Sequence, residues 1–69
     1  MEIILNNNPD VIETAEDSIT VENLLRIKKF SYKLLVVKIN DILIKKEDYP
    51  ISRVVKGDNV QVIHLITGG

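Results

Sequence analysis

The sequence contains no cysteine, one histidine and three glycines, two of which are the final residues Gly68 and Gly69. Without cysteine the chain has no thiol nucleophile, redox pair or disulfide, and this favours a cytoplasmic protein. A single histidine, His64, cannot supply a His-based metal cluster. One internal glycine, Gly57, is too few for a glycine-rich phosphate loop, so we do not expect the chain to bind ATP itself.

An excess of one charge and long apolar runs are also missing. Nine Lys and Arg against ten Asp and Glu give a net charge of −1, which provides no basic field for nucleic acid. No apolar run approaches the ~20 residues of a membrane-spanning helix, and the first residues do not resemble a secretory signal. We therefore expect neither nucleic acid nor a membrane among the partners. The clustered cations are interpreted as solvated surface: Arg26, Lys28, Lys29, Lys45 and Lys46.

The composition that remains is that of one small globular domain. The chain has 69 residues, of which 45% are hydrophobic and 28% charged. We expect a folded domain over residues 1–66 and a flexible tail over residues 67–69, because glycine loses more backbone freedom on ordering than any other residue. No feature demands a homo-oligomer, so we expect a monomer when the protein is free.

The N-terminal segment predicts a β-hairpin. Residues 2–6 and 10–14 are β-rich runs on either side of an Asn-Asn-Asn-Pro turn. Pro9 cannot donate to a strand ladder, which suits an edge strand. Residues 15–18 are interpreted as a loop.

A helix is predicted over residues 21–29. Thr20 is the expected N-cap, because its hydroxyl can accept a hydrogen bond from an N–H of the first turn. Ile19 and Leu24 have the spacing of a hydrophobic staple. Val21, Leu24, Leu25 and Lys28 fall on one face of this helix, with Ile27 flanking that face.

The second half predicts three more strands. Residues 34–40 and 42–44 indicate a hairpin through the tight turn Asn40-Asp41. A Gly57-Asp58 turn then leads into a last strand over residues 59–66.

The last strand alternates, with Val60 and Val62 on one face and Ile63 and Leu65 on the other. One pair should pack against the helix, and the other should lie outward or meet a partner. The element order favours an α+β fold: a mixed sheet of four to five strands covered on one face by a single helix. This is the layout of a β-grasp, or ubiquitin-like, domain in which the first and last strands pair centrally, although other small α+β arrangements stay open.

Several segments, in this order, resemble the ThiS family, the bacterial sulfur carriers of thiamine biosynthesis. They are VKIN at 37–40 followed by ILI at 42–44, KED before Tyr49, VKGDNV at 55–60 and ITGG at 66–69. The resemblance covers essentially the whole chain. It departs at Asn40-Asp41, where the family often has Asn-Gly, and at Tyr49, where the family often has Trp.

The resemblance implies a protein co-substrate rather than an enzyme, with no bound cofactor. The carboxylate of Gly69 would be adenylated by a ThiF-like partner enzyme that uses ATP. A sulfur donor protein would convert the adenylate into a thiocarboxylate, and the sulfur would pass to a ThiG-like thiazole synthase. Gly68 would permit close backbone approach, while Thr67 and Ile66 would guide the tail into its slot.

Side chains near the tail are candidates for partner contacts. Ile63 and Leu65 form a candidate hydrophobic docking patch, with burial in the core as the equal alternative. His64 is interpreted as a partly exposed residue near the strand end, with a partner contact as the alternative. No Ser-His-Asp arrangement is indicated by Ser18, Ser31 or Ser52.

Two alternative functions stay open. Carriers of the molybdopterin-synthase small-subunit type, or of tRNA thiolation, share the chemistry, but the approach Leu65-Ile-Thr67 contains no proline, which favours thiamine. The other alternative is a β-grasp interaction module without covalent chemistry.

Overall fold

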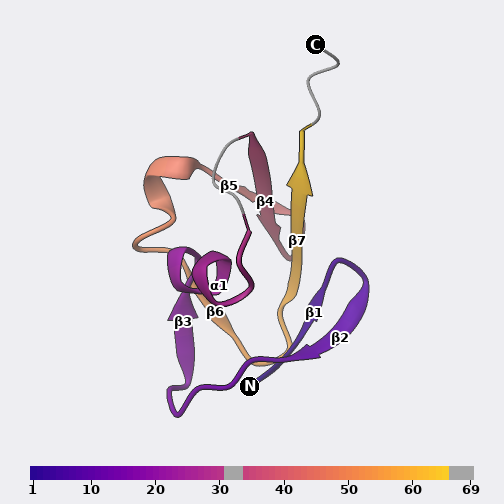
Figure 1. Cartoon of the computed structure of the whole chain (residues 1–69), viewed down its shortest axis with the longest axis vertical. Coiled ribbons are helices and arrows are strands. Elements are labelled where there is room, and N and C mark those ends of the chain that lie inside the picture. The colour runs from indigo at the N-terminus through magenta and orange to yellow at the C-terminus, as the bar shows by residue number, and fades with distance from the viewer. Residues whose placement is uncertain (31–33, 66–69) are drawn as a thin grey trace.

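The computed structural model describes residues 1–30 and 34–65. Five strands form one mixed sheet in the order β2-β1-β7-β4-β5, and β3 pairs with β6 in a separate two-stranded sheet. Figure 1 shows α1 beside this second sheet, both on the same side of the main sheet. The elements are β1 (Glu2–Leu5), β2 (Asn8–Val11), β3 (Ser18–Thr20), α1 (Val21–Ile27), β4 (Leu35–Ile39), β5 (Ile42–Ile44), the 3₁₀ turn η1 (Lys46–Asp48), β6 (Arg53–Val55) and β7 (Asn59–His64).

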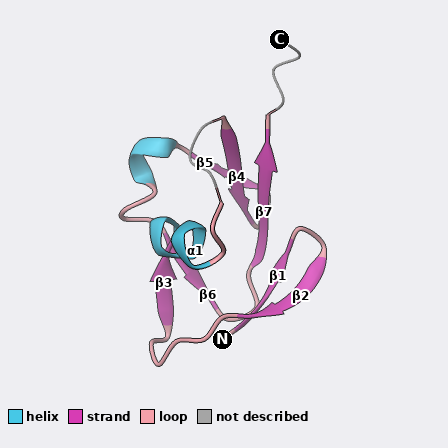
Figure 2. Cartoon of the chain, viewed as in Figure 1, coloured by secondary structure: helices cyan, strands magenta, loops and turns pink. Residues whose placement is uncertain are grey.

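The first and last strands meet in the middle of the main sheet. β1 runs parallel to β7, with Leu5 opposite Val60, and β4 runs antiparallel to β7, with Val37 opposite Val62. Figure 2 shows this arrangement of strands with the helix on one side. The expected β-grasp fold, with one helix on a mixed five-stranded sheet, is confirmed.

The core lies between α1 and the main sheet. Val21, Leu24 and Leu25 are fully buried on the helix, as the apolar spacing predicted. Val37 and Val60 are fully buried on the central strands. Each such aliphatic side chain contributes about 1.5–3 kcal/mol when it is removed from water, so the alternation on β7 and the helical stripe together determine which faces meet.

The ends of α1 follow from local hydrogen bonding. The Thr20 hydroxyl accepts from the Asn23 N–H at 3.1 Å, which confirms the predicted N-cap. The prediction of helix up to residue 29 is wrong, because Lys29 has a φ of +60° and the helix ends at Ile27. The Phe30 N–H donates back to the Leu25 carbonyl at 2.9 Å, as in a Schellman motif. Within the described ranges no helix is long and apolar enough to cross a membrane.

Both hairpins of the main sheet turn through two residues in the left-handed region. Asn6 and Asn7 have φ values of 50° and 69°, and Asn40 and Asp41 have 50° and 68°. Positive φ at both central residues is the geometry of a type I′ turn, which matches the twist of paired strands. The predicted Asn40-Asp41 turn is therefore confirmed, with aspartate at a position that favours glycine.

Two expectations about the first third of the chain are wrong. The second strand covers Asn8–Val11 rather than residues 10–14, because the two-residue turn places Leu5 directly opposite Asn8. The expected loop over residues 15–18 ends in β3, where Ile19 pairs with Val54 of β6. A three-residue strand has no recognisable period of its own, since distant pairing determines it. Pro9 lies in edge strand β2, as expected.

Candidate functional site at the end of the last strand

The end of β7 is hydrogen-bonded up to the last described residue, Leu65, on the β4 side and up to Val62 on the β1 side. On one side the Leu65 N–H donates to the Leu34 carbonyl at 2.7 Å. On the other side the Val62 N–H donates to Asn6 Oδ1 at 2.8 Å. The predicted tail residues lie outside the described residues: Ile66, Thr67, Gly68 and Gly69. The strand is therefore anchored to β4 at the point where those residues begin.

The two faces of β7 differ in exposure. Val60 and Val62 are 0% and 4% exposed and face the helix, whereas Ile63 and Leu65 are 43% and 48% exposed. The second pair therefore lies outward and is not part of the core. Its role in docking stays a prediction.

Residues of β4 and β5 extend this exposed surface. Val36 stands opposite Ile63, and Leu43, which is 59% exposed, stands opposite Lys38. Cross-strand partners share a face of the sheet. We call the set Val36, Leu43, Ile63 and Leu65 the outer patch.

His64 is exposed on the helix side of the sheet, opposite Leu35. Its ring centroid lies 6.0 Å from that of Phe30, with the rings tilted by 51°. This agrees with the expected partly exposed residue near the strand end, and a contact with a partner stays a prediction.

The two serines that the structure describes, Ser18 and Ser52, take part in structural contacts. Ser18 Oγ accepts from Arg53 Nε at 3.0 Å, which links β3 to β6, and the Ser52 carbonyl accepts from the Val21 N–H at 2.9 Å. Ser31 lies outside the described residues. In the part of the chain that the structure describes, no group of three His, Asp or Glu side chains is placed to hold a metal ion.

The sequence profile of the ThiS family matches residues 3–69, nearly the entire chain. The chain belongs to the ThiS family. This confirms the resemblance that the motifs indicated. None of the curated proteins compared with the chain matches it.

Solved structures similar to this ThiS-family chain include two from Geobacter metallireducens. One is a crystal structure of the thiamine biosynthesis protein ThiS, with 24% identity, a TM-score of 0.86 and all of both chains covered. The other is a solution structure of a thiamine biosynthesis protein, with 27% identity and a TM-score of 0.81. That alignment covers 100% of this chain and 88% of the other. The likeness confirms the β-grasp fold.

The side chain of Asn40 holds the start of β7 in this ThiS-family chain, as that of Asn6 holds Val62. The Asn59 N–H donates to Asn40 Oδ1 at 2.9 Å, and Asn40 Nδ2 donates to Asp58 Oδ1 at 3.0 Å. Asp58 Oδ2 also accepts from the Val55 N–H at 2.9 Å. Sequence reasoning identified Asn40 as a turn residue but missed its bond to β7, since a turn motif carries no signal for a contact 19 residues away.

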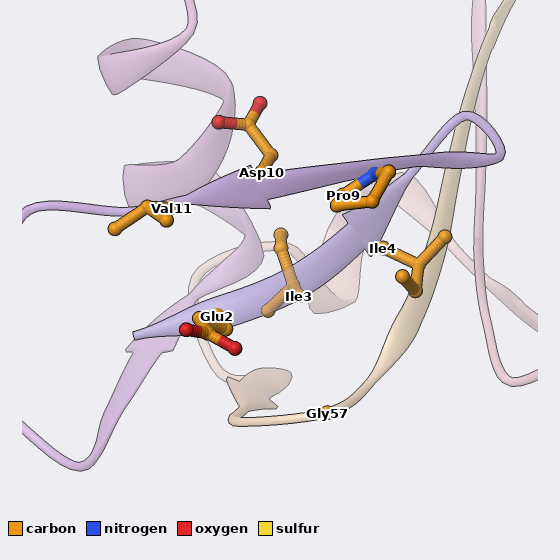
Figure 3. A pocket seen from close by; sticks show the side chains of 7 residues that line it. All are labelled: Glu2, Ile3, Ile4, Pro9, Asp10, Val11 and Gly57. Carbon is orange, nitrogen blue, oxygen red and sulfur yellow. The ribbon is translucent and has the colours of Figure 1, made fainter.

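A hollow of about 530 Å³ lies along the first hairpin, beside Gly57 in the turn that precedes β7 (Figure 3). Two acidic residues, Glu2 and Asp10, are among its lining residues, and the carboxylate of Asp10 is paired with Lys28 at 2.8 Å. The remaining lining residues are Ile3, Ile4, Pro9, Val11 and Gly57.

Proposed function

We propose that this chain is a sulfur carrier of thiamine biosynthesis and that its working group is the α-carboxylate of Gly69. The single observation that supports this most is the family match, which extends through the terminal Gly-Gly to residue 69. The anchoring of β7 up to Leu65 supports it further, because a rigid domain can present the residues that follow to another protein.

The chemistry begins with activation of a poor acyl donor. The carboxyl group, with a reference pKa of about 3.5, is anionic at neutral pH and would expel oxide if attacked directly. In the proposed reaction, a carboxylate oxygen of Gly69 attacks the α-phosphate of ATP held by an adenylating enzyme. Pyrophosphate leaves, and the product is a glycyl adenylate.

Sulfur then replaces one oxygen. A hydrosulfide ion (HS⁻) supplied by a sulfur donor protein attacks the glycyl carbonyl carbon, AMP departs with its bridging oxygen, one proton is lost, and a terminal thiocarboxylate remains. This group would deliver its sulfur to a thiazole synthase. The chain acts as a co-substrate in these steps, and ATP is consumed by the partner enzyme.

The tail residues have roles that follow from their size. Gly68 has no Cβ, so the backbone next to the reacting carbonyl can enter a narrow channel. Thr67 and Ile66 guide the tail into that channel. The outer patch, through Ile63 and Leu65, docks on the partner, because exposed aliphatic side chains gathered on one face are suited to burial in an interface.

Pyrophosphate exchange into ATP, catalysed by a cognate adenylating enzyme, tests the proposal. Replacing Gly69→Ala, or adding one residue after Gly69, should abolish exchange, while the circular dichroism spectrum and melting temperature stay those of the wild type. Normal turnover of either variant would remove the claim that this carboxylate is the acceptor.

A further inference from the structure

The end of β7 extends past the hairpin that flanks it. β1 pairs with β7 over two residues only: Ile4 lies opposite Asn59, and Leu5 lies opposite Val60. The Asn6 N–H then donates to the Val60 carbonyl at 2.9 Å, and Asn6 Oδ1 accepts from the Val62 N–H. There the hairpin turns away, whereas β7 continues to His64, as Figure 1 shows.

Beyond this point, the backbone groups of every second residue of β7 face away from β4. In an antiparallel ladder, alternate residues direct both N–H and C=O toward the same neighbour. Residues 59 and 65 bond toward β4, where the Asn40 N–H and the Leu34 carbonyl meet them. The backbone N–H and C=O groups of Val62 and His64 therefore point to the other side of β7, where β1 has ended. Among residues 1–30 and 34–65, no hydrogen bond satisfies the Val62 carbonyl or the His64 N–H on that side. We call these two groups the open edge.

We propose that the open edge is where an extended segment of the adenylating enzyme adds a strand to β7. This rests on the proposed function. A residue spans at most about 3.6 Å of chain, so the enzyme pocket that holds Gly69 lies within roughly 15 Å of Leu65. An enzyme that activates Gly69 must therefore contact the chain around the open edge. Buried backbone groups need partners, and a paired strand supplies them at the spacing that β7 presents.

The side chains around the open edge indicate what such a strand carries. On the outer face it lies next to Ile63 and Leu65, so apolar residues fit there. On the helix face it meets His64 and its ring neighbour Phe30, which fits an aromatic or aliphatic residue. The strand therefore continues the outer patch, and one contact surface combines main-chain pairing with apolar burial. A second copy of this chain is the competing occupant.

Two substitutions at one position separate backbone pairing from side-chain contact. His64→Pro removes the N–H of the open edge while the bonds to β4 remain, since proline is tolerated where the N–H points outward. His64→Val removes the same side chain but keeps the N–H. The two variants should have equal melting temperatures. The KM of the adenylating enzyme should be about tenfold higher for the Pro variant than for the Val variant, a difference of ~1.4 kcal/mol in binding free energy.

Amide hydrogen exchange of the isotope-labelled wild-type chain gives a direct second readout. The His64 amide should exchange readily in the free protein and be slowed at least about tenfold by the adenylating enzyme. If the enzyme adenylates the wild type but leaves this amide unprotected and the two KM values equal, strand addition is overturned while the carrier function stands. Protection that appears without enzyme, as the chain concentration rises, favours a second copy and also overturns it. No adenylation of the wild type overturns both proposals.

Discussion

The side-chain oxygen of Asn6 accepts a hydrogen bond from the backbone N–H of Val62, 2.8 Å away and 56 residues later in the sequence. Asn6 is the first of the two central residues of a type I′ turn, with a φ of 50°. One residue thus closes the first hairpin and extends the pairing of β1 with β7 by a side-chain bond. The position of the final strand therefore depends on the turn of the first hairpin.

Replacing Asn6→Gly should lower the free energy of unfolding by about 1–2 kcal/mol, because glycine keeps the left-handed backbone but leaves a partly buried N–H without its partner. Asn7→Gly is the matched control. Asn7 has a φ of 69°, and no bond from it to β7 is found in the described ranges. That control should be neutral or slightly stabilising in urea unfolding. Equal effects of the two variants would show that the Asn6 side chain contributes nothing specific.

Replacing Lys29→Gly should stabilise the protein by about 0.5–1 kcal/mol. Lys29 has a φ of +60° directly after α1, a conformation that disfavours residues with a Cβ by roughly 1–2 kcal/mol, and the entropy cost of glycine offsets only part of this gain. Arg26→Gly, inside the last helical turn, should have the opposite sign and cost about 1 kcal/mol. Thermal unfolding of both variants checks the prediction, and a destabilised Lys29→Gly variant contradicts the assigned helix end.

The ion pair between the edge strand and the helix predicts a dependence of stability on pH. Lys28 Nζ lies 2.8 Å from Asp10 Oδ2, and this hydrogen bond holds the pKa of Asp10 below its ordinary value of 3.8. Because the folded-state pKa is lowered, the contribution is fully present above the unfolded pKa and is lost as pH falls through the folded pKa.

The free-energy difference between the wild type and Asp10→Asn should therefore be constant from neutral pH to about pH 5 and shrink as the pH falls below 3.8, the ordinary pKa of the group, toward its lower folded-state pKa. Urea unfolding at several pH values measures it. A difference that instead grows on acidification would mean that Asp10 gains no stabilisation from Lys28.

The outer patch predicts a loss of partner affinity that depends on position. Ile63→Lys places a charge on an aliphatic surface that would be buried in the complex, so the KM of the adenylating enzyme should rise about tenfold or more. Ile51→Lys is the control, since Ile51 is 71% exposed in the loop after η1, outside the patch. If both variants show the wild-type KM, docking occurs on another surface.

Local patterns predicted most of the architecture. The alternation of Val60 and Val62 with Ile63 and Leu65 predicted two faces of β7, and the Thr20 cap predicted the start of α1. What local patterns missed depends on contacts made at a distance. β3 exists because Ile19 meets Val54, and the asparagine bonds to β7 exist because the fold brings the turns to that strand.

The sequence also could not decide whether Ile63 and Leu65 lie in the core or on the surface. Both faces of a central strand can be buried, and only the placement of α1 and of the β3–β6 pair on one side decides which residues stay exposed. The helix end was missed for a related reason. Lysine is a good helix former, and nothing in residues 28–30 except the observed backbone shows that the chain turns left-handed at Lys29.

Intact mass spectrometry, with fragmentation to locate the change, tests the central claim most directly. The chain is incubated with its cognate adenylating enzyme, ATP and a sulfur donor. The account predicts the mass increase of one sulfur replacing one oxygen, located at Gly69 and absent when ATP is omitted. A chain that remains unmodified at Gly69 while its partners are active, or one that carries sulfur at another residue, would contradict it.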